Sequence, residues 1–386
     1  MRFKQYHCPW STYHLSDIAE VVGGGTPDTT VSSLWNGDIQ WFTPTEVGHQ
    51  KYVSKSARTI TQLGLQKSSA KKLPAGSILL SSRATIGECS IAQRECTTNQ
   101  GFQNLIPKKD TNNEFLYYLA QTKKHHFIKY ASGSTFLEIS NSEIKKTKCT
   151  VPGTEEQTQI AAFLSALDDR IAVQNKIIED LKVLKKELCA KLFGSPLCGR
   201  IIAIEQVADI YGGYAFNSKA YVNKGKYKIV TIGNVTGDKY ISGNYNTIDR
   251  LPNNIQKPQV LSKGDILVSL TGNVGRISIV DGDEYLLNQR VAKLGIEDDL
   301  TKEYIYQYLS NSSFEKDMIN AGQGAAQKNI KNQDILSYCI RFPTDQTALE
   351  NIDKLLSLYD IRITSEKAIL SNLILQKSYY LRAMFI

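Results

Sequence analysis

The chain has 386 residues and a net charge of +8 at pH 7, with 41% hydrophobic and 22% charged residues. This length fits two or three domains, and the composition supports buried cores, which excludes disordered and collagen-like chains. No run reaches the roughly 18 apolar residues of a membrane span, and residues 1–5 lead into no signal-peptide core. We therefore expect a soluble protein of the cytoplasm.

The cysteines and histidines do not form a recognisable metal site. There is no Cys-x-x-Cys pair, and none of the seven cysteines stands at zinc spacing from a histidine. His125 and His126 are adjacent, so their side chains diverge on a helix. We expect no metal, and we expect reduced thiols at Cys8, Cys89, Cys96, Cys149, Cys189, Cys198 and Cys339.

An internal repeat with a period of about 190 residues is the strongest signal in the chain. Residues 18–24 match residues 207–213, and residues 73–82 match residues 261–270 as a turn followed by a strand. Each strand enters a loop of small residues and returns, which predicts a hairpin in each half. Further along, the matching pairs are Asn99-Gln100 with Asn288-Gln289, and residues 133–144 with residues 324–335.

Each half ends in a long helical pattern without Pro or Gly. Apolar residues recur in steps of four and three, which predicts a coiled-coil seam in each helix. The two seams are equivalent, because adding 192 to each residue number of the first seam gives the residue number of the second. Polar residues interrupt the two seams at equivalent positions: Gln174 corresponds to Glu366, and Lys185 corresponds to Lys377. We predict that the two helices pair with each other; the alternative is two helices packed separately on their own domains. The predicted seam comprises Leu164, Leu167, Ile171, Gln174, Ile178, Leu181, Leu356, Tyr359, Ile363, Glu366, Leu370 and Leu373.

The repeat divides the chain into four expected segments. These are a globular domain at 1–153, a spacer helix at 154–193, a second globular domain at 194–343 and a C-terminal helix at 344–386. Their net charges are +7, −1, +2 and zero. Positive charge on the globular regions suits phosphate neutralisation, although many mildly basic proteins bind no DNA.

Helices of about forty residues would be about 60 Å long. If approximate twofold symmetry relates the halves, the helices run antiparallel and hold the globular domains apart. About 60 Å corresponds to about 17 base pairs of B-DNA, so two contacted segments with an untouched gap would fit. The sequence thus predicts a spacer between two DNA-reading modules.

Common catalytic motifs are missing from the sequence. There is no phosphate-binding loop of the Gly-x-x-x-x-Gly-Lys type, and Gly23-Gly24-Gly25 lacks dinucleotide-binding spacing. No Asn-Pro-Pro-aromatic or Asp-Pro-Pro-aromatic motif of amino-methyltransferases occurs, and Glu143-Ile144-Lys145 lacks the upstream Pro-Asp of a metal nuclease. We expect a non-catalytic chain.

The whole chain resembles the specificity subunit of type I restriction-modification systems. The resemblance covers essentially all residues and rests on the repeat, on residues 261–267 with residues 73–79, on the Asn-Gln pairs, and on Pro152 and Gln157 at the start of the helix. The second helix departs from this start, because Pro343 and Gln346 stand two residues closer together. The resemblance implies an α+β fold: two similar target recognition domains, joined by two long helices in an antiparallel coiled coil with pseudo-twofold repetition.

The resemblance also implies partners. Such a subunit reads a bipartite sequence in double-stranded DNA and docks two modification (methyltransferase) subunits, which use S-adenosylmethionine to methylate adenine N6. Restriction (translocase and endonuclease) subunits would add cleavage that depends on ATP and Mg2+. The chain itself would hold none of these cofactors.

DNA contacts vary with the target in such proteins, so the candidates come from side-chain chemistry. Arginine, lysine and amide side chains contact base edges, and lysine, serine and threonine contact phosphates. We expect Gln100 and Gln289, which lie in the repeat's core pattern, to bond the backbone rather than a base. The first-half candidates are Lys71, Lys72, Arg83, Thr85, Ser132, Ser134, Thr135, Lys145 and Lys146. The second-half candidates are Thr271, Asn273, Arg276, Gln323, Lys328 and Lys331.

Two other classes of protein remain open from the residues. One is a DNA methyltransferase or nuclease that carries its own target recognition domains, which a cofactor motif would reveal. The other is a tandem-repeat interaction scaffold without DNA binding, which the small charge of the second half would fit.

Overall fold

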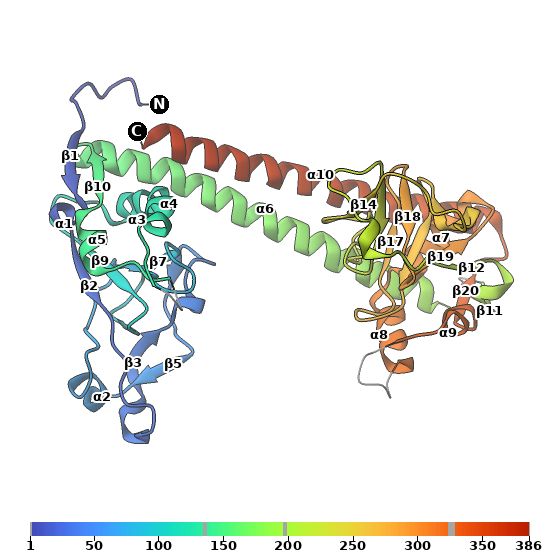
Figure 1. Cartoon of the computed structure of the whole chain (residues 1–386), viewed down its shortest axis with the longest axis horizontal. Helices are drawn as coiled ribbons and strands as arrows, with labels where there is room; N and C mark the ends of the chain where they lie inside the picture. Colours follow the sequence, from blue (N-terminus) through green and yellow to red (C-terminus); the bar gives the residue numbers. More distant parts are fainter. Residues whose placement is uncertain (1, 134–136, 196–198, 323–328, 386) are drawn as a thin grey trace. The chain divides into compact units, whose positions relative to one another are not determined.

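The structure is a computed structural model that describes residues 2–133, 137–195, 199–322 and 329–385. It divides into a first unit of Met1–Val173 with Leu370–Ile386, and a second unit of Gln174–Ile369 (Figure 1). Each of two long helices, α6 (Thr154–Gly194) and α10 (Gln346–Met384), contributes one part to each unit. Among the described residues, no helix has the length and hydropathy that spanning a membrane requires.

The first unit combines two mixed sheets with short helices. One sheet has the strand order β2-β9-β6-β7-β4, a second has the order β5-β3-β8, and β1 pairs with β10. Its strands are β1 (Ser11–His14), β2 (Ala19–Gly23), β3 (Trp35–Phe42), β4 (Tyr52–Val53), β5 (Arg58–Ile60), β6 (Ile78–Leu80), β7 (Cys89–Ala92), β8 (Thr97–Thr98), β9 (Gln103–Pro107) and β10 (Lys148–Val151). Its short helices are α1 (Leu15–Ile18), α2 (Gln62–Gln66), α3 (Asn113–Thr122), α4 (Lys124–Lys129) and α5 (Asn141–Lys146).

The second unit repeats this topology. The sheet β12-β19-β16-β17 corresponds to β2-β9-β6-β7, the sheet β14-β13-β18-β15 corresponds to β5-β3-β8 with one more strand, and β11 pairs with β20. Its strands are β11 (Arg200–Ala203), β12 (Asp209–Gly212), β13 (Tyr227–Val230), β14 (Asn246–Ile248), β15 (Val260–Leu261), β16 (Ile266–Ser269), β17 (Ile277–Ile279), β18 (Tyr285–Leu287), β19 (Val291–Gly295) and β20 (Cys339–Phe342). Its short helices are α7 (Asp299–Leu309), α8 (Ser312–Ala321) and α9 (Asn332–Leu336).

The two predicted hairpins are confirmed. β6 pairs antiparallel with β7, with Leu80 opposite Cys89, and β16 pairs antiparallel with β17, with Val268 opposite Ile277. All residues of these four strands are buried, which explains their continuous apolar runs.

The glycines that follow β2 and β12 are explained by the close approach of another backbone segment to each of them. A Cβ atom on Gly24 would lie 1.9 Å from the carbonyl oxygen of Asn99, and one on Gly213 would lie 2.0 Å from that of Asn288. Any side chain would displace this backbone, so both halves need glycine there. The contact brings the predicted glycine and Asn-Gln segments of each half together.

The two long helices pair with each other in antiparallel directions within each unit. In the first unit, Met384 shares a core cluster with Ile160 and Leu164. In the second, Cys189 and Phe193 share one with Ile352. Residue numbers thus rise along α6 as they fall along α10. This confirms the expected fold class and excludes helices packed separately.

The predicted seam positions face inward along this pair. Seven of them are buried: Leu164, Leu167, Gln174, Ile178, Leu356, Glu366 and Leu373 lie below one-tenth exposure, and Leu164 and Leu356 are fully enclosed. The others, Ile171, Leu181, Tyr359, Ile363 and Leu370, are half-buried. The helices begin at Thr154 and Gln346, so the second starts two residues later than the expected 344.

Candidate nucleic-acid interface

The loop between β6 and β7 carries the first-half candidates Arg83 and Thr85. Ala84 adopts a left-handed φ of 57°, which makes the turn tight. The Arg83 guanidinium pairs with the Glu138 carboxylate through a 2.7 Å Nε–Oε2 contact, and the Thr85 hydroxyl lies 3.2 Å from the Ser81 hydroxyl. Both predicted residues are therefore partly exposed and held in place by neighbours.

The predicted lysines of the first half lie at the surface. Lys71 and Lys145 line one open hollow together with Lys108 and Asn141. Lys72 pairs with Glu95 at 2.7 Å, and both side chains are exposed. Because exposed ion pairs stabilise a fold weakly, such a lysine remains available to a phosphate.

Four first-half candidates remain, and the structure describes two of them. Lys146 lies 3.9 Å from Glu143, one turn back along α5. Ser132 is exposed, and its backbone N–H donates to the carbonyl oxygen of Glu138 at 2.9 Å. Ser134 and Thr135 lie outside the described residues.

The corresponding loop of the second half joins β16 to β17. Gly272 has a φ of 70° where the first half has Ala84, so both loops turn in the same way. Asn273 is exposed, and its carbonyl oxygen accepts a hydrogen bond from the Ser269 hydroxyl. The Arg276 guanidinium pairs with Glu315 at 3.2 Å. Gln323 and Lys328 lie outside the described residues.

Two second-half candidates, Thr271 and Lys331, line one open hollow of about 610 Å³. The hollow also contains side chains that the sequence did not single out as DNA contacts: Gln289, Arg290, Asn329 and Asn332. A signal for them existed, because each lies next to a matched segment of the repeat.

The expectation that Gln100 bonds the backbone is wrong. Its side chain is exposed and accepts a hydrogen bond from the Thr26 hydroxyl. Gln289 is exposed too. The core pattern around these residues belongs to their neighbours Phe102 and Val291, which are fully buried.

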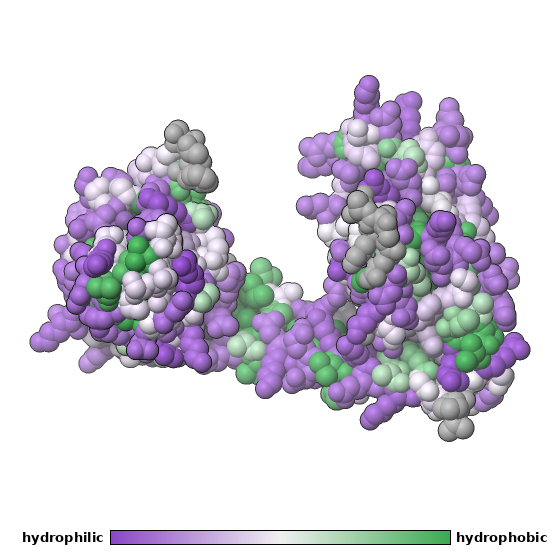
Figure 2. Space-filling model, turned by 90° about the horizontal axis from the view of Figure 1, so that it is seen from below, coloured by the Kyte–Doolittle hydropathy of each residue, from purple (hydrophilic) through white to green (hydrophobic). Residues whose placement is uncertain are grey.

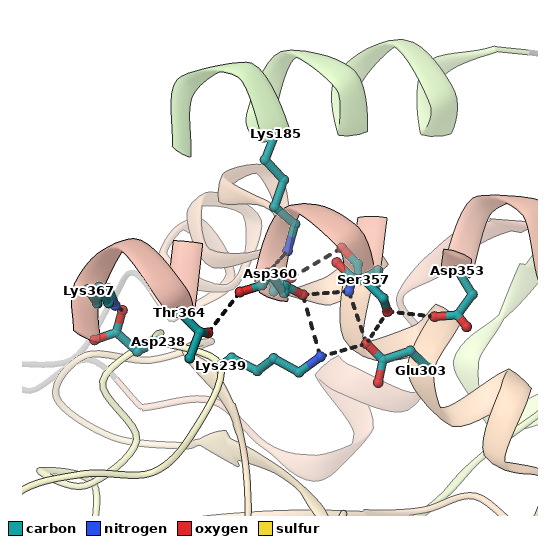
Figure 3. Close-up of polar contacts among 11 residues, drawn as sticks. Lys185, Asp238, Lys239, Glu303, Asp353, Ser357, Asp360, Thr364 and Lys367 are labelled. Atoms are coloured by element: carbon teal, nitrogen blue, oxygen red, sulfur yellow. Dashed lines mark hydrogen bonds and ion pairs between the residues drawn. The ribbon is translucent and has the colours of Figure 1, made fainter. Parts of the chain in front are cut away.

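A polar network that the sequence did not reveal ties each globular part to the long helices. In the second unit, the Asp360 carboxylate accepts from Gln307 at 2.8 Å and contacts the ammonium groups of Lys185 and, at 3.6 Å, Lys239 (Figure 3). Lys239 also pairs with Glu303 at 3.1 Å. Burial lowers the pKa of Lys239, but the Glu303 and Asp360 carboxylates outweigh this effect and hold that pKa above its ordinary value.

The first unit contains the equivalent network. Asp168 accepts from the Tyr118 hydroxyl at 2.7 Å and pairs with Lys377 at 2.6 Å, while Lys51 pairs with Glu114 at 3.0 Å. Asp168 and Asp360 are 192 residues apart, as are Lys185 and Lys377. The lysine interruptions of the seam, Lys185 and Lys377, are thus partners for aspartates on the facing helix, and comparing charged residues at this offset would have found them.

Comparison with known proteins bears on the same two halves. The family model described as type I restriction modification DNA specificity domain matches residues 8–183 and again residues 200–374. The chain is 26% identical over 382 residues to the type I restriction enzyme MjaVIII specificity subunit of Methanocaldococcus jannaschii, which covers 90% of this chain and 87% of that protein.

Other relatives align with about half of the chain, and one of them has a higher sequence identity. The MjaIX specificity subunit of the same organism is 40% identical over 188 residues, which is 48% of this chain and 44% of that protein. The EcoR124I/EcoR124II specificity subunit of Escherichia coli is 28% identical over 188 residues, which is 47% of this chain and 45% of that protein. These two alignments therefore span less than half the length of either relative.

A solved structure supports the fold over the full length. The S subunit of a type I restriction-modification system from M. genitalium has a TM-score of 0.56 at 16% identity, covering 100% of this chain and 99% of that chain. Two family-model matches, which together span most of the sequence, coincide with the two halves of the repeat. The chain therefore belongs to the family of type I restriction-modification DNA specificity domains.

Proposed function

We propose that this chain recognises a bipartite sequence in double-stranded DNA and assembles a type I restriction-modification complex around it. The observation that carries the proposal is the match of the DNA specificity domain to both halves, which share the strand orders β2-β9-β6-β7 and β12-β19-β16-β17. Two similar domains read two half-sites, and their different side chains allow the two half-sites to differ in sequence.

The charge of the globular regions supports DNA as the ligand. Residues 1–153 carry +7, and the first-unit hollow that contains Lys71, Lys108 and Lys145 gathers three of these cations. Such groups would neutralise phosphates and set the position of the duplex, while other side chains read the bases. This role places the chain in the cytoplasm together with DNA.

Exposed apolar side chains on the long helices support the assembly role. On the face drawn in Figure 2, hydrophilic residues predominate and hydrophobic residues form small groups. Exposed apolar side chains that gather in contiguous patches mark surfaces for partners. In the first unit they include Val173, Ile374, Leu375 and Tyr379, and in the second Leu355, Leu358 and Ile361.

The partners would be two modification subunits and restriction subunits. In this proposal the chain is non-catalytic, and S-adenosylmethionine, ATP and Mg2+ are bound by the partners, which methylate adenine N6 and cleave DNA. The chain contributes the choice of sequence and the geometry of assembly.

Gel shifts with random duplex DNA over a range of salt concentrations test the proposal. We expect binding that weakens steeply with salt and becomes sequence-selective once modification subunits are added. Absence of DNA binding both with and without those subunits would rule the proposal out in favour of a scaffold role.

A further inference from the structure

Three pairs of polar side chains surround the β6–β7 loop of the first unit and satisfy each other. Arg83 pairs with Glu138 at 2.7 Å, and the Thr26 hydroxyl donates to Gln100. The Asn141 side-chain amide donates to the Gln103 oxygen at 2.6 Å. The polar groups of these three pairs thus have partners within the protein.

The second unit keeps this backbone arrangement. The bridge between Arg83 and Glu138 is repeated between Thr271 and Asn329. The hydrogen bond from the Ile139 N–H to the Ser82 carbonyl is repeated from Ile330 to Leu270. Gln289 therefore stands where Gln100 stands, and Asn332 stands where Asn141 stands.

The partner side chains, however, are missing from the second unit. Ala215 occupies the place of Thr26. Ala292 occupies the place of Gln103, because Ala292 lies opposite Gly212 in its sheet as Gln103 lies opposite Gly23. Thr271 and Asn329 replace the charged pair. Within the described ranges, the side chains of Gln289, Asn329 and Asn332 have no hydrogen-bond partner, and the buried Thr271 hydroxyl has none either.

These side chains converge on the open hollow beside the loop. Its other lining residues include Arg290, where the first half has Gly101, and Lys331, and none of the described residues that line it is acidic. Only Leu270 and Ile330 among its eight lining residues are apolar. Pockets for small molecules are mostly apolar, so this lining does not fit such a ligand.

The chemistry of the lining fits the edges of bases. Amide side chains form paired hydrogen bonds with adenine, and arginine forms them with guanine, while lysine contacts phosphate. We infer that the second unit reads purines of its half-site in the hollow formed by Thr271, Gln289, Arg290, Asn329, Lys331 and Asn332. The inference rests on the proposed function, because it names which residues of the second domain select the sequence.

The first unit supplies the physical contrast. Gln100 and Asn141 would have to give up an internal hydrogen bond before contacting a base, whereas Gln289 and Asn332 give up only water. The repeat thus assigns the amides of Gln100 and Asn141 to internal bonding in the first half, and the equivalent amides of Gln289 and Asn332 to DNA in the second.

Selection of bound sequences from a pool of random duplex DNA tests this inference. The full chain, assembled with its modification subunits, is compared with the variants Gln289→Ala and Ala215→Thr. Ala215 is exposed, and Ala215→Thr introduces the hydroxyl that in the first half donates to Gln100. This hydroxyl would compete with a base for the Gln289 side chain, while Gln289 itself stays in place. We expect both variants to relax the same one or two positions in one half of the selected motif, with roughly tenfold weaker binding to the wild-type site.

Matched controls separate this role from folding. Gln100→Ala removes the equivalent, internally bonded amide of the first unit. Asn253→Ala removes an exposed amide of the second unit that lies outside the hollow. Both variants are expected to leave unchanged the half of the motif that Gln289→Ala relaxes. Thermal melting verifies that each variant folds. A selected motif that is unchanged in Gln289→Ala, or in Ala215→Thr, overturns the inference while the proposed function stands. If the wild-type complex selects no bipartite motif, the proposed function itself fails.

Discussion

The side-chain amide of Gln174 donates a 3.1 Å hydrogen bond to the backbone carbonyl oxygen of Glu366, and these two residues occupy the same place in the two halves of the repeat. The same amide also contacts the Glu366 carboxylate, which Arg362 approaches from one turn away. Both residues are buried. Equivalent positions of α6 and α10 therefore meet at a polar contact, which fixes the register of an otherwise apolar seam.

Replacing Gln174 by Leu is expected to destabilise the chain. The Glu366 carboxylate would lose the amide that contacts it inside the seam, which costs about 1–3 kcal/mol of unfolding free energy. Urea unfolding measures the change. The double variant with Glu366→Leu should recover much of the loss, because it leaves no buried carboxylate. Lys176→Ala, at an exposed position of α6, is the control, and an equal loss there would contradict the role of Gln174.

Replacing Asp360 by Ala is expected to loosen the second unit. Its carboxylate is buried and contacts Lys185, Lys239 and Gln307, so removing it leaves the Lys185 ammonium without its carboxylate partner, at a cost of about 3 kcal/mol. Hydrogen exchange should show faster exchange in α7 and in the neighbouring turns of α10. Asp168→Ala should act in the same way in α3 of the first unit, with a smaller effect because Asp168 is more exposed. Uniformly faster exchange throughout the chain would argue against two separate networks.

Replacing Arg83 by Ala is expected to relax recognition of one half-site only. The ion pair with Glu138 orients the guanidinium at an exposed loop, and losing a base contact of this kind costs about 1–3 kcal/mol at the position that it reads. Sequence selection from random duplex DNA reports the change. An equal loss of information in both half-sites would sink this assignment.

Replacing Lys71 by Ala is expected to weaken binding to every sequence alike. An exposed lysine in the basic hollow of the first unit would contact phosphate, so its loss should lower the salt slope by about 1 without altering the selected motif. Titrations at several salt concentrations measure the slope, and a changed motif would contradict a phosphate role.

Exchanging residues 1–153 with the same region of a relative is expected to transplant one half of the target. The structure adds a condition, because Ile160, Leu164 and Met384 belong to the core of the first unit and lie outside the exchanged segment. Exchanges that keep these contacts should fold, as measured by thermal melting. A change in the other half-site would contradict the modular account.

Much of the fold could be predicted because its signals are local or repeated. A buried apolar run that enters a loop of small residues and returns predicts hairpins such as that of Leu80 and Cys89, and steps of four and three predict the seam at Leu164 and Leu356. A repeat adds pairing information, because two helices with polar residues at equivalent places indicate a shared interface. The segments 1–153 and 194–343 remain predictions as domain boundaries, since the compact units also include parts of both helices.

The partners of individual polar side chains could not be predicted in this way. Lys185 appears in the sequence as an interruption of a seam, and only the antiparallel pairing of α6 with α10 places it beside Asp360. Similarly, the hollow at Thr271 combines residues from three segments, those around Leu270, Gln289 and Asn329. Periodicity reports which face of an element is buried, whereas hydrogen bonds depend on which distant segments the fold makes adjacent. For this protein the amino-acid pattern alone determined the architecture, and tertiary contacts decided which of its polar side chains are satisfied internally and which remain exposed without an internal partner.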